Sequence, residues 1–307
     1  MKKVLVATQK PFASQAVVLI AEKCKEAGYE LVVLEKYAEQ ADLVNAVIDA
    51  DALIIRSDKV TKEVLENAKN LKVVVRGGAG YDNVDCAAAT ANDVAVMNTP
   101  GQNSNAVAEL AFGMMLYMAR GKFNGKAGTE LKDKTIGIHA YGNVGVNVAR
   151  IAKGFGMTVC AFDPYVEAKV MEAAGVKALD SVEDLYSQCD YISLHLPSIP
   201  ATKNSVNYNL LKLMKPGAAL INTARKEVVC DDGVIKLMAE RDDFSFASDI
   251  APVKAEELME KFAERCFFTP KKMGAQTQEA NVNAGVAAIE QIIAYLEKGD
   301  NTFQVNQ

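Results

Sequence analysis

Apolar residues follow two alternating patterns along most of this chain. Short runs rich in valine, isoleucine and leucine are separated by longer stretches in which apolar residues recur with a helical period. The short runs predict buried strands, and the longer stretches predict helices with one buried face. Strands that alternate with helices form parallel sheets with crossover helices, so we expect an α/β fold. The predicted strands are 3–8, 30–34, 52–56, 72–76, 94–98, 135–139, 158–163, 191–196, 218–222, 244–248 and 267–269. The predicted helices include 14–27, 104–120, 207–214, 232–240, 255–264 and 277–298.

One strand, turn and helix, residues 135–155, has the spacing of a dinucleotide-binding loop. Gly142 would let the backbone approach a pyrophosphate, and Gly145 would let the helix pack close to the strand. The helix N-terminus offers free N–H groups to an anion. Asp163 ends the next strand, where a carboxylate can accept hydrogen bonds from both ribose hydroxyls. The stretch therefore predicts a Rossmann-type nucleotide site.

The fingerprint lacks its first glycine, because Ala140 occupies that position. We expect the turn to tolerate this Cβ by keeping φ negative at Ala140. An ordinary strand-to-helix turn is the alternative interpretation. The strand before the turn, the amphipathic helix after it and the spacing to Asp163 favour a dinucleotide site.

The chain divides into two series of strands and helices. The first fills residues 1 to 103, and a glycine- and lysine-rich connection at 121–128 leads into the second. The last helix, 277–298, is long enough to leave the second series and pack on the first. We expect two Rossmann-like parallel-sheet domains, 1–103 completed by 281–307 and 104–280, with the active site in the cleft between them.

Composition excludes several classes of function. The 307 residues carry a net charge of −5, without the basic surface that nucleic-acid binding needs. The six cysteines include no C-x-x-C pair, which indicates reduced thiols in a cytoplasmic protein and no metal site. The apolar run 106–119 is shorter than the roughly 20 residues that span a bilayer, and the N-terminus has no signal-peptide pattern. We expect a small-molecule substrate and no nucleic-acid or membrane partner.

Several motifs, in one order, resemble those of the D-isomer-specific 2-hydroxyacid dehydrogenases, most of all short forms of D-3-phosphoglycerate dehydrogenase. The resemblance covers nearly the whole chain and implies that no C-terminal regulatory domain is present. The motifs are RGGAGYDNVD at 76–85, NTPGQN at 98–103, AVAE at 106–109, the fingerprint itself, HLP at 195–197 with Thr202, INTAR at 221–225, SD at 248–249 and GAQTQEA at 274–280.

The resemblance implies a function. The expected reaction is NAD-dependent oxidation of D-3-phosphoglycerate to 3-phosphohydroxypyruvate, a step of serine biosynthesis. The alternatives are a glyoxylate or hydroxypyruvate reductase of the same family and a catalytically silent NAD-binding regulator. By the same resemblance, 1–103 with 281–307 is the substrate-binding domain, 104–280 is the NAD-binding domain, and the protein is a homodimer.

The resemblance also implies which residues form the site. On the substrate side these are Arg56, Ser57, the N–H groups of Ala79 and Gly80, and Asn103. On the cofactor side they are Tyr141, Gly142, Asn143, Val144, Asp163, Pro164, His195, Leu196, Pro197, Thr202, Thr223, Ala224, Asp249 and Gly274.

Arg225 is the candidate for activating the substrate. It follows an apolar strand and a short turn, at the edge of an α/β sheet where sites gather. The matching arginine of the family binds the substrate's carboxylate and keto oxygen and polarises the carbonyl. A structural salt bridge is the alternative interpretation.

The chain departs from the family at its acid/base. The family uses a histidine oriented by a glutamate, and counting from Asp249 places Lys272 and Lys254 at these two positions. Lys271 is a possible occupant if the register shifts by one residue. Three interpretations remain open: loss of catalysis, replacement by Glu256 or Glu257, or proton transfer by Lys272 itself. A lysine needs a lowered pKa for this, which burial and like charges in the cleft would supply. The intact cofactor motifs and Arg225 favour Lys272.

Overall fold

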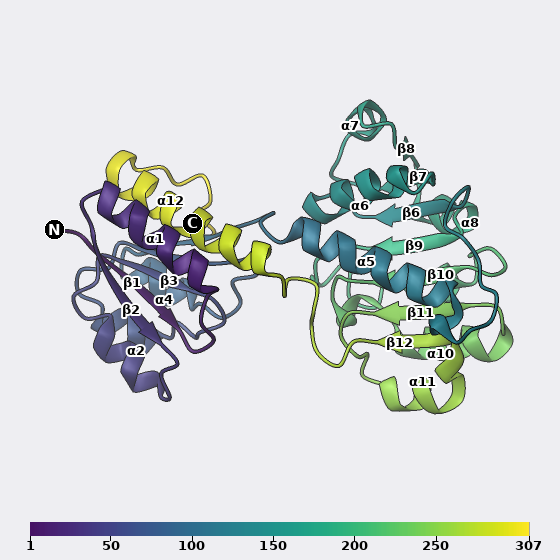
Figure 1. Ribbon diagram of the computed structural model, residues 1–307, viewed down its shortest axis with the longest axis horizontal. Helices are drawn as coiled ribbons and strands as arrows, with labels where there is room; N and C mark the ends of the chain where they lie inside the picture. Colours follow the sequence, from purple (N-terminus) through teal and green to yellow (C-terminus); the bar gives the residue numbers. More distant parts are fainter. Residues whose placement is uncertain (307) are drawn as a thin grey trace. The chain divides into compact units, whose positions relative to one another are not determined.

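The structure, a computed structural model, describes residues 1–306 and divides the chain into two compact units (Figure 1). Unit 1 comprises residues 1–103 and 277–307, and unit 2 comprises residues 104–276. The sequence placed the second boundary at 280. The structure divides the chain four residues earlier, directly before Thr277, which caps the last helix, α12 (Gln278–Lys298), by accepting a hydrogen bond from Ala280 N.

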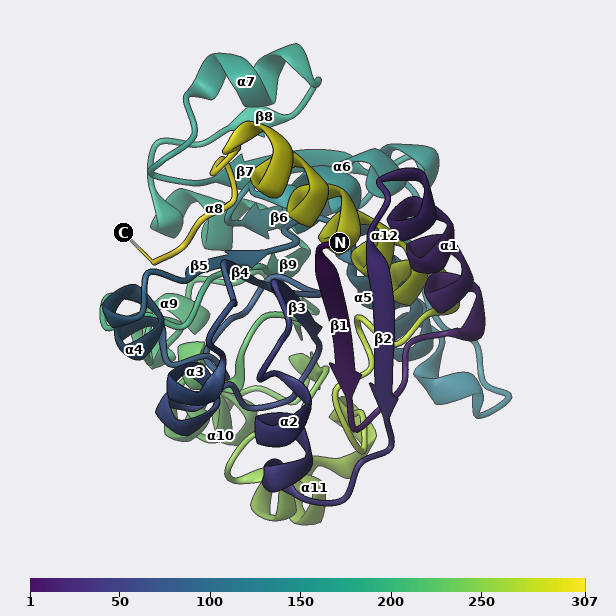
Figure 2. The same cartoon turned by 90° about the vertical axis from the view of Figure 1, so that its left-hand side faces the viewer.

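Unit 1 is a parallel sheet of five strands covered by helices on both faces. The strand order is β2-β1-β3-β4-β5, the flavodoxin-like order. The strands are β1 (Lys3–Thr8), β2 (Glu30–Glu35), β3 (Ala52–Ile55), β4 (Val73–Arg76) and β5 (Ala95–Asn98). Helices α1 (Ser14–Glu26) and α12 lie side by side on one face, and α2 (Gln40–Ala46), α3 (Lys62–Asn67) and α4 (Cys86–Ala91) cover the other (Figure 2).

Alternate side chains of a strand point to opposite faces of the sheet, which explains why helices pack on both faces in unit 1. Val4 and Val6 of β1 pack toward α1 and α12, whereas Leu5 and Ala7 pack toward α2, α3 and α4. All four side chains are fully buried. A strand that is apolar on both faces belongs in the middle of a parallel sheet, as the sequence pattern predicted.

Unit 2 is a parallel sheet of seven strands in the order β12-β11-β10-β9-β6-β7-β8. The strands are β6 (Thr135–His139), β7 (Thr158–Phe162), β8 (Lys177–Ala178), β9 (Tyr191–Leu194), β10 (Ala219–Asn222), β11 (Ser245–Ser248) and β12 (Cys266–Phe268). The order reverses between β6 and β9, as in Rossmann domains. The expected α/β class with parallel sheets is confirmed.

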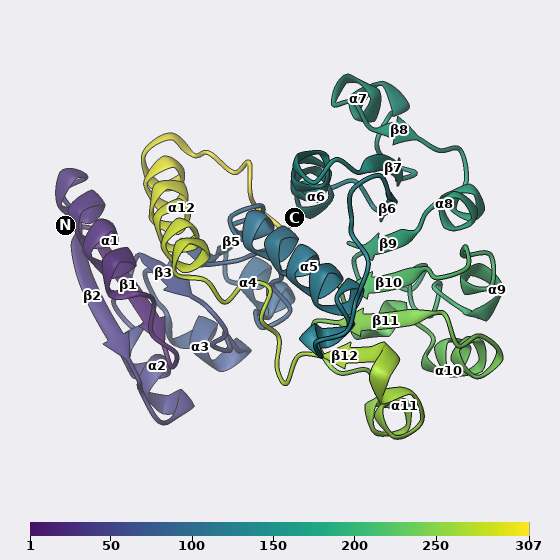
Figure 3. The ribbon, with the colours of Figure 1, turned by 45° about the vertical axis from the view of Figure 1, so that its right-hand side comes forward.

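Helices cover both faces of the second sheet (Figure 3). The apolar helix α5 (Ser104–Ala119) packs beside α6 (Asn143–Gly154) on one face. The other face carries α8 (Val182–Gln188), α9 (Tyr208–Leu211), α10 (Asp231–Glu240) and α11 (Ala255–Phe262). The short helix α7 (Ala168–Ala173) connects β7 to β8. No helix within residues 1–306 is long and apolar enough to cross a membrane.

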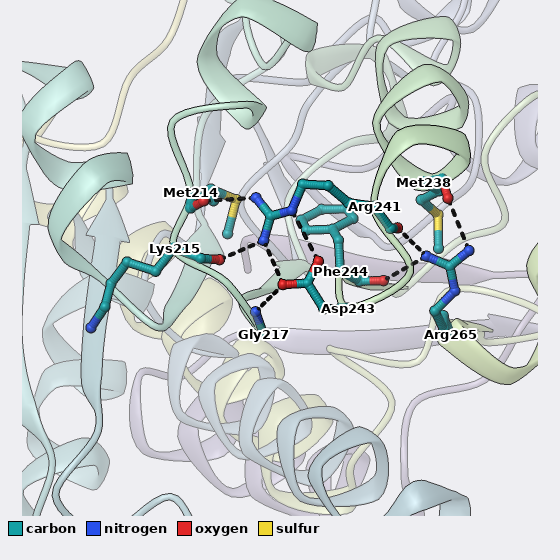
Figure 4. A network of polar contacts seen from close by, with 8 residues as sticks. All are labelled: Met214, Lys215, Gly217, Met238, Arg241, Asp243, Phe244 and Arg265. Carbon is teal, nitrogen blue, oxygen red and sulfur yellow. Dashed lines mark hydrogen bonds and ion pairs between the residues drawn. The ribbon is translucent and has the colours of Figure 1, made fainter.

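A polar network ties together the amino ends of β10, β11 and β12 (Figure 4). Arg241 donates to the backbone oxygens of Met214 and Lys215 and to the carboxylate of Asp243, which also accepts from Gly217 N. Arg265 donates to the oxygens of Met238 and Arg241. The Arg241 guanidinium lowers the pKa of Asp243 to about 2. The network fixes the edge of the sheet opposite the strand ends that carry the candidate site.

Candidate functional site

The predicted residues of unit 2 gather at the carboxyl ends of its strands. The turn after β6 carries the fingerprint, and His195 follows β9, on the other side of the reversal in strand order. His195 N donates to the backbone oxygen of His139 at 3.0 Å, so the chain segments that leave the two strands stay adjacent. Open α/β sheets bind their ligands at such a reversal.

The fingerprint turn has the space that a pyrophosphate needs. A Cβ built on Gly142 would meet nothing within 4 Å, so the backbone there is open to a ligand. A Cβ on Gly145 would lie 2.5 Å from the backbone oxygen of Ala140, so this glycine is needed for helix α6 to pack against the turn. The residues present therefore fit a dinucleotide at the N-terminus of α6.

Ala140 differs from the expectation in its backbone. Its φ is +82°, not negative, so it adopts the conformation of the glycine that it replaces. An L-residue with a Cβ pays about 1–2 kcal/mol in this region. The turn keeps the shape of the fingerprint at the cost of local strain.

Asp163 already shapes the nucleotide turn before any ligand is considered. Its carboxylate accepts hydrogen bonds from Tyr141 N at 2.8 Å and Tyr165 N at 2.9 Å. A carboxylate has about four acceptor positions, so each oxygen keeps capacity for a ribose hydroxyl. The predicted role is compatible with this geometry.

His195 is held between two hydroxyl groups. Its Nε2 lies 3.0 Å from Ser193 Oγ, and its Nδ1 lies 3.4 Å from Thr223 Oγ1. Burial, and then the neighbouring His139, lower the pKa of His195 to about 3. The imidazole is therefore neutral at physiological pH.

The other predicted cofactor residues lie on turns of the same edge. Thr202 closes the turn after His195, because its hydroxyl donates to Pro197 O and accepts from Ile199 N. Asn143 and Val144 begin α6, whereas Pro164, Leu196 and Ala224 lie on loops that follow β7, β9 and β10.

Arg225 follows β10 and is half-buried. Asn222 fixes its backbone, since Asn222 Nδ2 donates to Arg225 O at 3.0 Å. One guanidinium nitrogen donates to Ala224 O at 2.9 Å, and no ion pair to Arg225 is formed within residues 1–306. The salt-bridge alternative is wrong for the part of the chain described, and most of the guanidinium fork remains available to an anion.

Asp249 follows β11 and holds the loop that carries Lys272. This buried carboxylate accepts from Thr269 Oγ1, Met273 N and Gly274 N at 2.7–2.8 Å. Lys272 itself is exposed. The burial that was expected to lower its pKa is therefore absent in this structure.

The charged neighbours proposed for Lys272 have other partners. Lys254 forms an ion pair with Asp232, which raises the lysine's pKa. Glu257 pairs with Lys261 one turn along α11 at 2.7 Å. Neither Lys254 as a like charge nor Glu257 as a replacement carboxylate gains support from this arrangement.

In unit 1, Arg56 follows β3 and is anchored on its own sheet edge. Its Nη1 donates to Pro11 O at 2.9 Å and to Lys10 O at 3.3 Å, and the guanidinium lies 5.3 Å from the centre of the Phe12 ring. Burial lowers the pKa of Arg56, although an arginine stays charged. Ser57 beside it is exposed.

The glycine-rich turn after β4 presents free backbone donors. Within residues 1–306, the N–H groups of Ala79 and Gly80 donate to no acceptor, whereas Ala79 O accepts from Asn98 Nδ2 at 2.6 Å. Consecutive free N–H groups form an anion-binding nest. Asn103, also predicted for the substrate side, is half-buried just before the boundary of the unit.

Arg76 supports the sheet edge that carries Arg56, a contact that the sequence analysis did not predict. Its Nε donates to Arg56 O at 3.0 Å, and a Cβ on Gly78 would lie 1.7 Å from Arg76 Nη1. The signal was present in the sequence, since an arginine that ends a buried strand directly before two glycines stands at the carboxyl edge of the sheet.

Comparisons with known proteins identify the family to which this fold belongs. Residues 106–271 match the family model of the D-isomer specific 2-hydroxyacid dehydrogenase, NAD binding domain. A crystal structure of NAD⁺-bound 3-phosphoglycerate dehydrogenase from Entamoeba histolytica is 42% identical with a TM-score of 0.87, covering 100% of this chain and 99% of that one.

Two curated relatives have different activities. The D-3-phosphoglycerate dehydrogenase of Methanocaldococcus jannaschii is 35% identical over 82% of this chain and 51% of its own length. The hydroxypyruvate reductase of Thermotoga maritima is 34% identical over 87% of this chain and 92% of its own length. The chain thus spans about half the length of the curated phosphoglycerate dehydrogenases that it matches. It belongs to the D-isomer-specific 2-hydroxyacid dehydrogenases, an enzyme family, and NAD is the cofactor of its second unit.

Proposed function

We propose that this protein oxidises D-3-phosphoglycerate to 3-phosphohydroxypyruvate, the first step of serine biosynthesis. The observation that carries the proposal is the shared edge of the second sheet. The nucleotide turn, Arg225 and the loop of Lys272 all follow carboxyl ends of its strands. The similarity of the Entamoeba histolytica enzyme over the whole chain supports phosphoglycerate as the substrate.

The nucleotide turn supplies binding and orientation. Gly142 leaves room for the pyrophosphate, and the N-terminus of α6 favours its negative charge. Asp163 accepts hydrogen bonds from the ribose. Bound NAD would supply the hydride acceptor for the substrate's carbinol carbon. The neutral His195, held by Ser193 and Thr223, contributes packing and hydrogen bonding in this role without adding a charge.

Arg225 activates the substrate in this proposal. Its planar fork binds the carboxylate and the oxygen on the reacting carbon, which stabilises the charge that develops on that oxygen. Lys272 acts as the general base in oxidation, taking the hydroxyl proton onto Nζ, and returns it in reduction. Because Lys272 is exposed in this structure, its pKa must be lowered in the complex with substrate, by desolvation and by the positive charge of Arg225.

Unit 1 contributes groups that recognise anions. The N–H groups of Ala79 and Gly80 hold the carboxylate, Asn103 and Ser57 add polar contacts, and Arg56 binds the phosphate at the other end of the substrate. Arg56 keeps donors for this purpose, since only its Nη1 is engaged by backbone oxygens.

Reduction of hydroxypyruvate is the second candidate. The match between this chain and the Thermotoga maritima hydroxypyruvate reductase covers nearly the whole length of that enzyme. Steady-state assays with 3-phosphoglycerate and NAD, and with phosphohydroxypyruvate, hydroxypyruvate or glyoxylate and NADH, test both candidates. A preference for the phosphorylated ketone supports our proposal, and a preference for hydroxypyruvate overturns it. NADH binding without turnover of any of these substrates identifies a silent regulator.

We also propose that the protein is a homodimer, as the resemblance implies. The test is the molar mass in solution, measured by size-exclusion chromatography with light scattering. A mass near 33.0 kDa, that of one chain, would contradict the proposal.

A further inference from the structure

Two neighbouring strands of unit 2 end in a pair of buried polar residues. Asp249 follows β11 and Thr269 follows β12, and the paired residues Ser248 and Phe268 precede them. The backbone pairing continues one step further, because Thr269 N donates to Ser248 O at 3.1 Å. Asp249 is 3% exposed and Thr269 is 5% exposed. The pair therefore sits on the rigid part of the sheet edge.

The loop 269–274 begins and ends on the same carboxylate. Thr269 Oγ1 donates to Asp249 Oδ1 at 2.8 Å, Met273 N donates to the same oxygen at 2.7 Å, and Gly274 N donates to Oδ2 at 2.8 Å. Hydrogen bonds to a carboxylate are stronger than those between neutral groups. Lys272 precedes two of the three donors directly in the chain, so its backbone position is fixed from both sides.

The loop packs closely on Asp249 at Gly274. A Cβ on Gly274 would lie 3.0 Å from Asp249 Oδ2 and 3.2 Å from Val107 Cγ2. The residue after Asp249 is Ile250, with a φ of +126°, a conformation that β-branched residues rarely adopt. Such strain persists only where the surrounding contacts determine the backbone fully. The three bonds to Asp249 are contacts of that kind.

We infer that Asp249 and Thr269 form a clamp that positions Lys272 for proton transfer. The inference rests on the proposed function, in which Lys272 carries the proton. The clamp acts through the backbone of the loop, since two of its three donors are the N–H groups of Met273 and Gly274. Thr269 is thus a positioning residue and touches neither substrate nor cofactor.

The kinetic test uses Thr269→Val, which keeps the shape and removes one bond of the clamp. We expect kcat for the oxidation of 3-phosphoglycerate to fall about tenfold, because loss of a positioned geometry lowers the rate of the chemical step. KM for NAD should stay within about twofold. Thr269→Ser, which keeps the hydroxyl, should restore most of kcat. Thr8→Val is the matched control, since Thr8 is fully buried in β1 and its hydroxyl has no hydrogen-bond partner among residues 1–306.

A double-mutant cycle decides whether the clamp acts through Lys272. With Lys272→Ala already present, Thr269→Val should lower the residual rate no further. If Thr269→Val lowers kcat tenfold both in the wild-type protein and in Lys272→Ala, the inference is overturned. It is also overturned if Thr269→Val leaves kcat unchanged while Lys272→Ala is inactive. If instead Lys272→Ala keeps full kcat, the proposed proton role fails, and the inference that rests on it fails with it.

Hydrogen exchange gives a readout that does not depend on activity. The amides of Met273 and Gly274 should exchange slowly in the wild-type protein and at least tenfold faster in Thr269→Val, with Thr8→Val unchanged. Exchange that is equal in all three proteins overturns the clamp even if the enzyme has another substrate. Faster exchange in a protein that turns over none of the substrates shows that the clamp holds the loop but overturns its role in proton transfer.

Discussion

The carboxylate of Asp163 accepts a hydrogen bond from the backbone N–H of Tyr141 at 2.8 Å. This bond links the turn after β6 to the end of β7, so the residue predicted to select the cofactor also fixes the loop beside the pyrophosphate. Its charge would repel the 2′-phosphate of NADP, and Pro164 and Tyr165 offer no cation to neutralise one.

We therefore predict a preference for NAD over NADP that depends on the charge of Asp163. Asp163→Asn, which keeps the size of the side chain, should narrow the ratio of kcat/KM for the two cofactors at least about tenfold, the scale of one charge-assisted contact. Asp163→Ala should narrow it as well and should also lower stability, because Tyr141 N and Tyr165 N lose their acceptor. Equal kcat/KM values for NAD and NADP in the wild-type enzyme would contradict the role of this carboxylate.

The strain at Ala140 predicts a stabilising substitution. Ala140→Gly should raise the free energy of unfolding by about 0.5–1 kcal/mol, since relief of a positive φ gains roughly 1–2 kcal/mol and the added freedom of the unfolded chain costs about 0.4–1. Urea denaturation measures the change. Ala149→Gly, in the helix that follows, is the control and should destabilise by about 1 kcal/mol or more. A loss of stability in Ala140→Gly equal to that of the control would show that the turn is not strained.

The buried histidine His139 predicts a loss of stability in mild acid. Burial lowers its pKa to about 4, against an opposing effect of Asp163, and its Nδ1 lies 3.2 Å from Tyr186 Oη. The unfolded chain binds a proton near pH 6.5 and the folded chain does not, so the stability from neutral His139 is complete above pH 6.5 and is lost as the pH falls toward 4. Over this pH range the contribution of His139 to the free energy of unfolding should fall by up to about 3 kcal/mol.

The test compares unfolding by urea at pH 7.5, 5.5 and 4.5. His139→Gln keeps a polar group for Tyr186 and removes the titration, so its stability should fall less between pH 7.5 and 4.5 than that of the wild-type protein. The difference between the two proteins excludes the carboxylates, which titrate in both. Identical pH dependence would show that His139 is not the source.

The sequence predicted the sheets well because buried parallel strands are apolar on both faces. β1 and β10 illustrate this, because each contains an unbroken run of buried apolar residues. It did not predict β8, because two residues, one of them exposed, form no pattern. The helix expected at 207–214 is helical only at Tyr208–Leu211. After Leu211 the chain continues in local bonds between residues three apart, from Leu213 N to Leu210 O and from Met214 N to Leu211 O, so the expected helix ends in tighter turns.

Site residues were predictable where a motif fixes them, and unpredictable where tertiary bonds decide. The spacing predicted correctly that Gly142 lies in an open turn before a helix and that Asp163 stands at the end of β7, and their roles toward the cofactor stay predictions. The φ of Ala140, the contact of Arg76 with Arg56 and the loop around Asp249 depend on segments distant in sequence. The pattern of apolar residues does not predict which carboxylate accepts a hydrogen bond from which backbone N–H.

Recognition of the phosphate should depend on Arg56. Arg56→Ala should lower kcat/KM for phosphohydroxypyruvate at least about tenfold, because a charge-assisted bond contributes roughly 1.5–3 kcal/mol. Hydroxypyruvate, which has no phosphate, should be affected much less. Arg56 also holds Pro11 O and stacks on Phe12, so thermal unfolding of the variant must be measured beside its kinetics. An equal loss with both substrates means that Arg56 is structural, and the assignment of phosphoglycerate loses its local support.

The last prediction concerns the proton. Lys272→Ala should lower kcat by about 10²–10⁴, the usual effect of removing a positioned acid/base, while NADH binding measured by fluorescence stays nearly unchanged. Lys272→Arg should be almost as slow, because a guanidinium cannot release its proton to act as a base. In the wild-type enzyme the rate of oxidation should rise with pH into the alkaline range as the lysine deprotonates, and this limb should disappear in both variants.

Lys271→Ala controls for the neighbouring lysine, which is also exposed on the loop. It should keep most of kcat, because the register set by Gly274 on Asp249 places Lys272 two residues before that glycine, where the family has its histidine. If Lys271→Ala or Glu257→Ala abolishes turnover while Lys272→Ala keeps it, the proton moves through another group. Of Lys271 and Glu257, Glu257 is the less favoured base, because its carboxylate would first have to break its ion pair with Lys261.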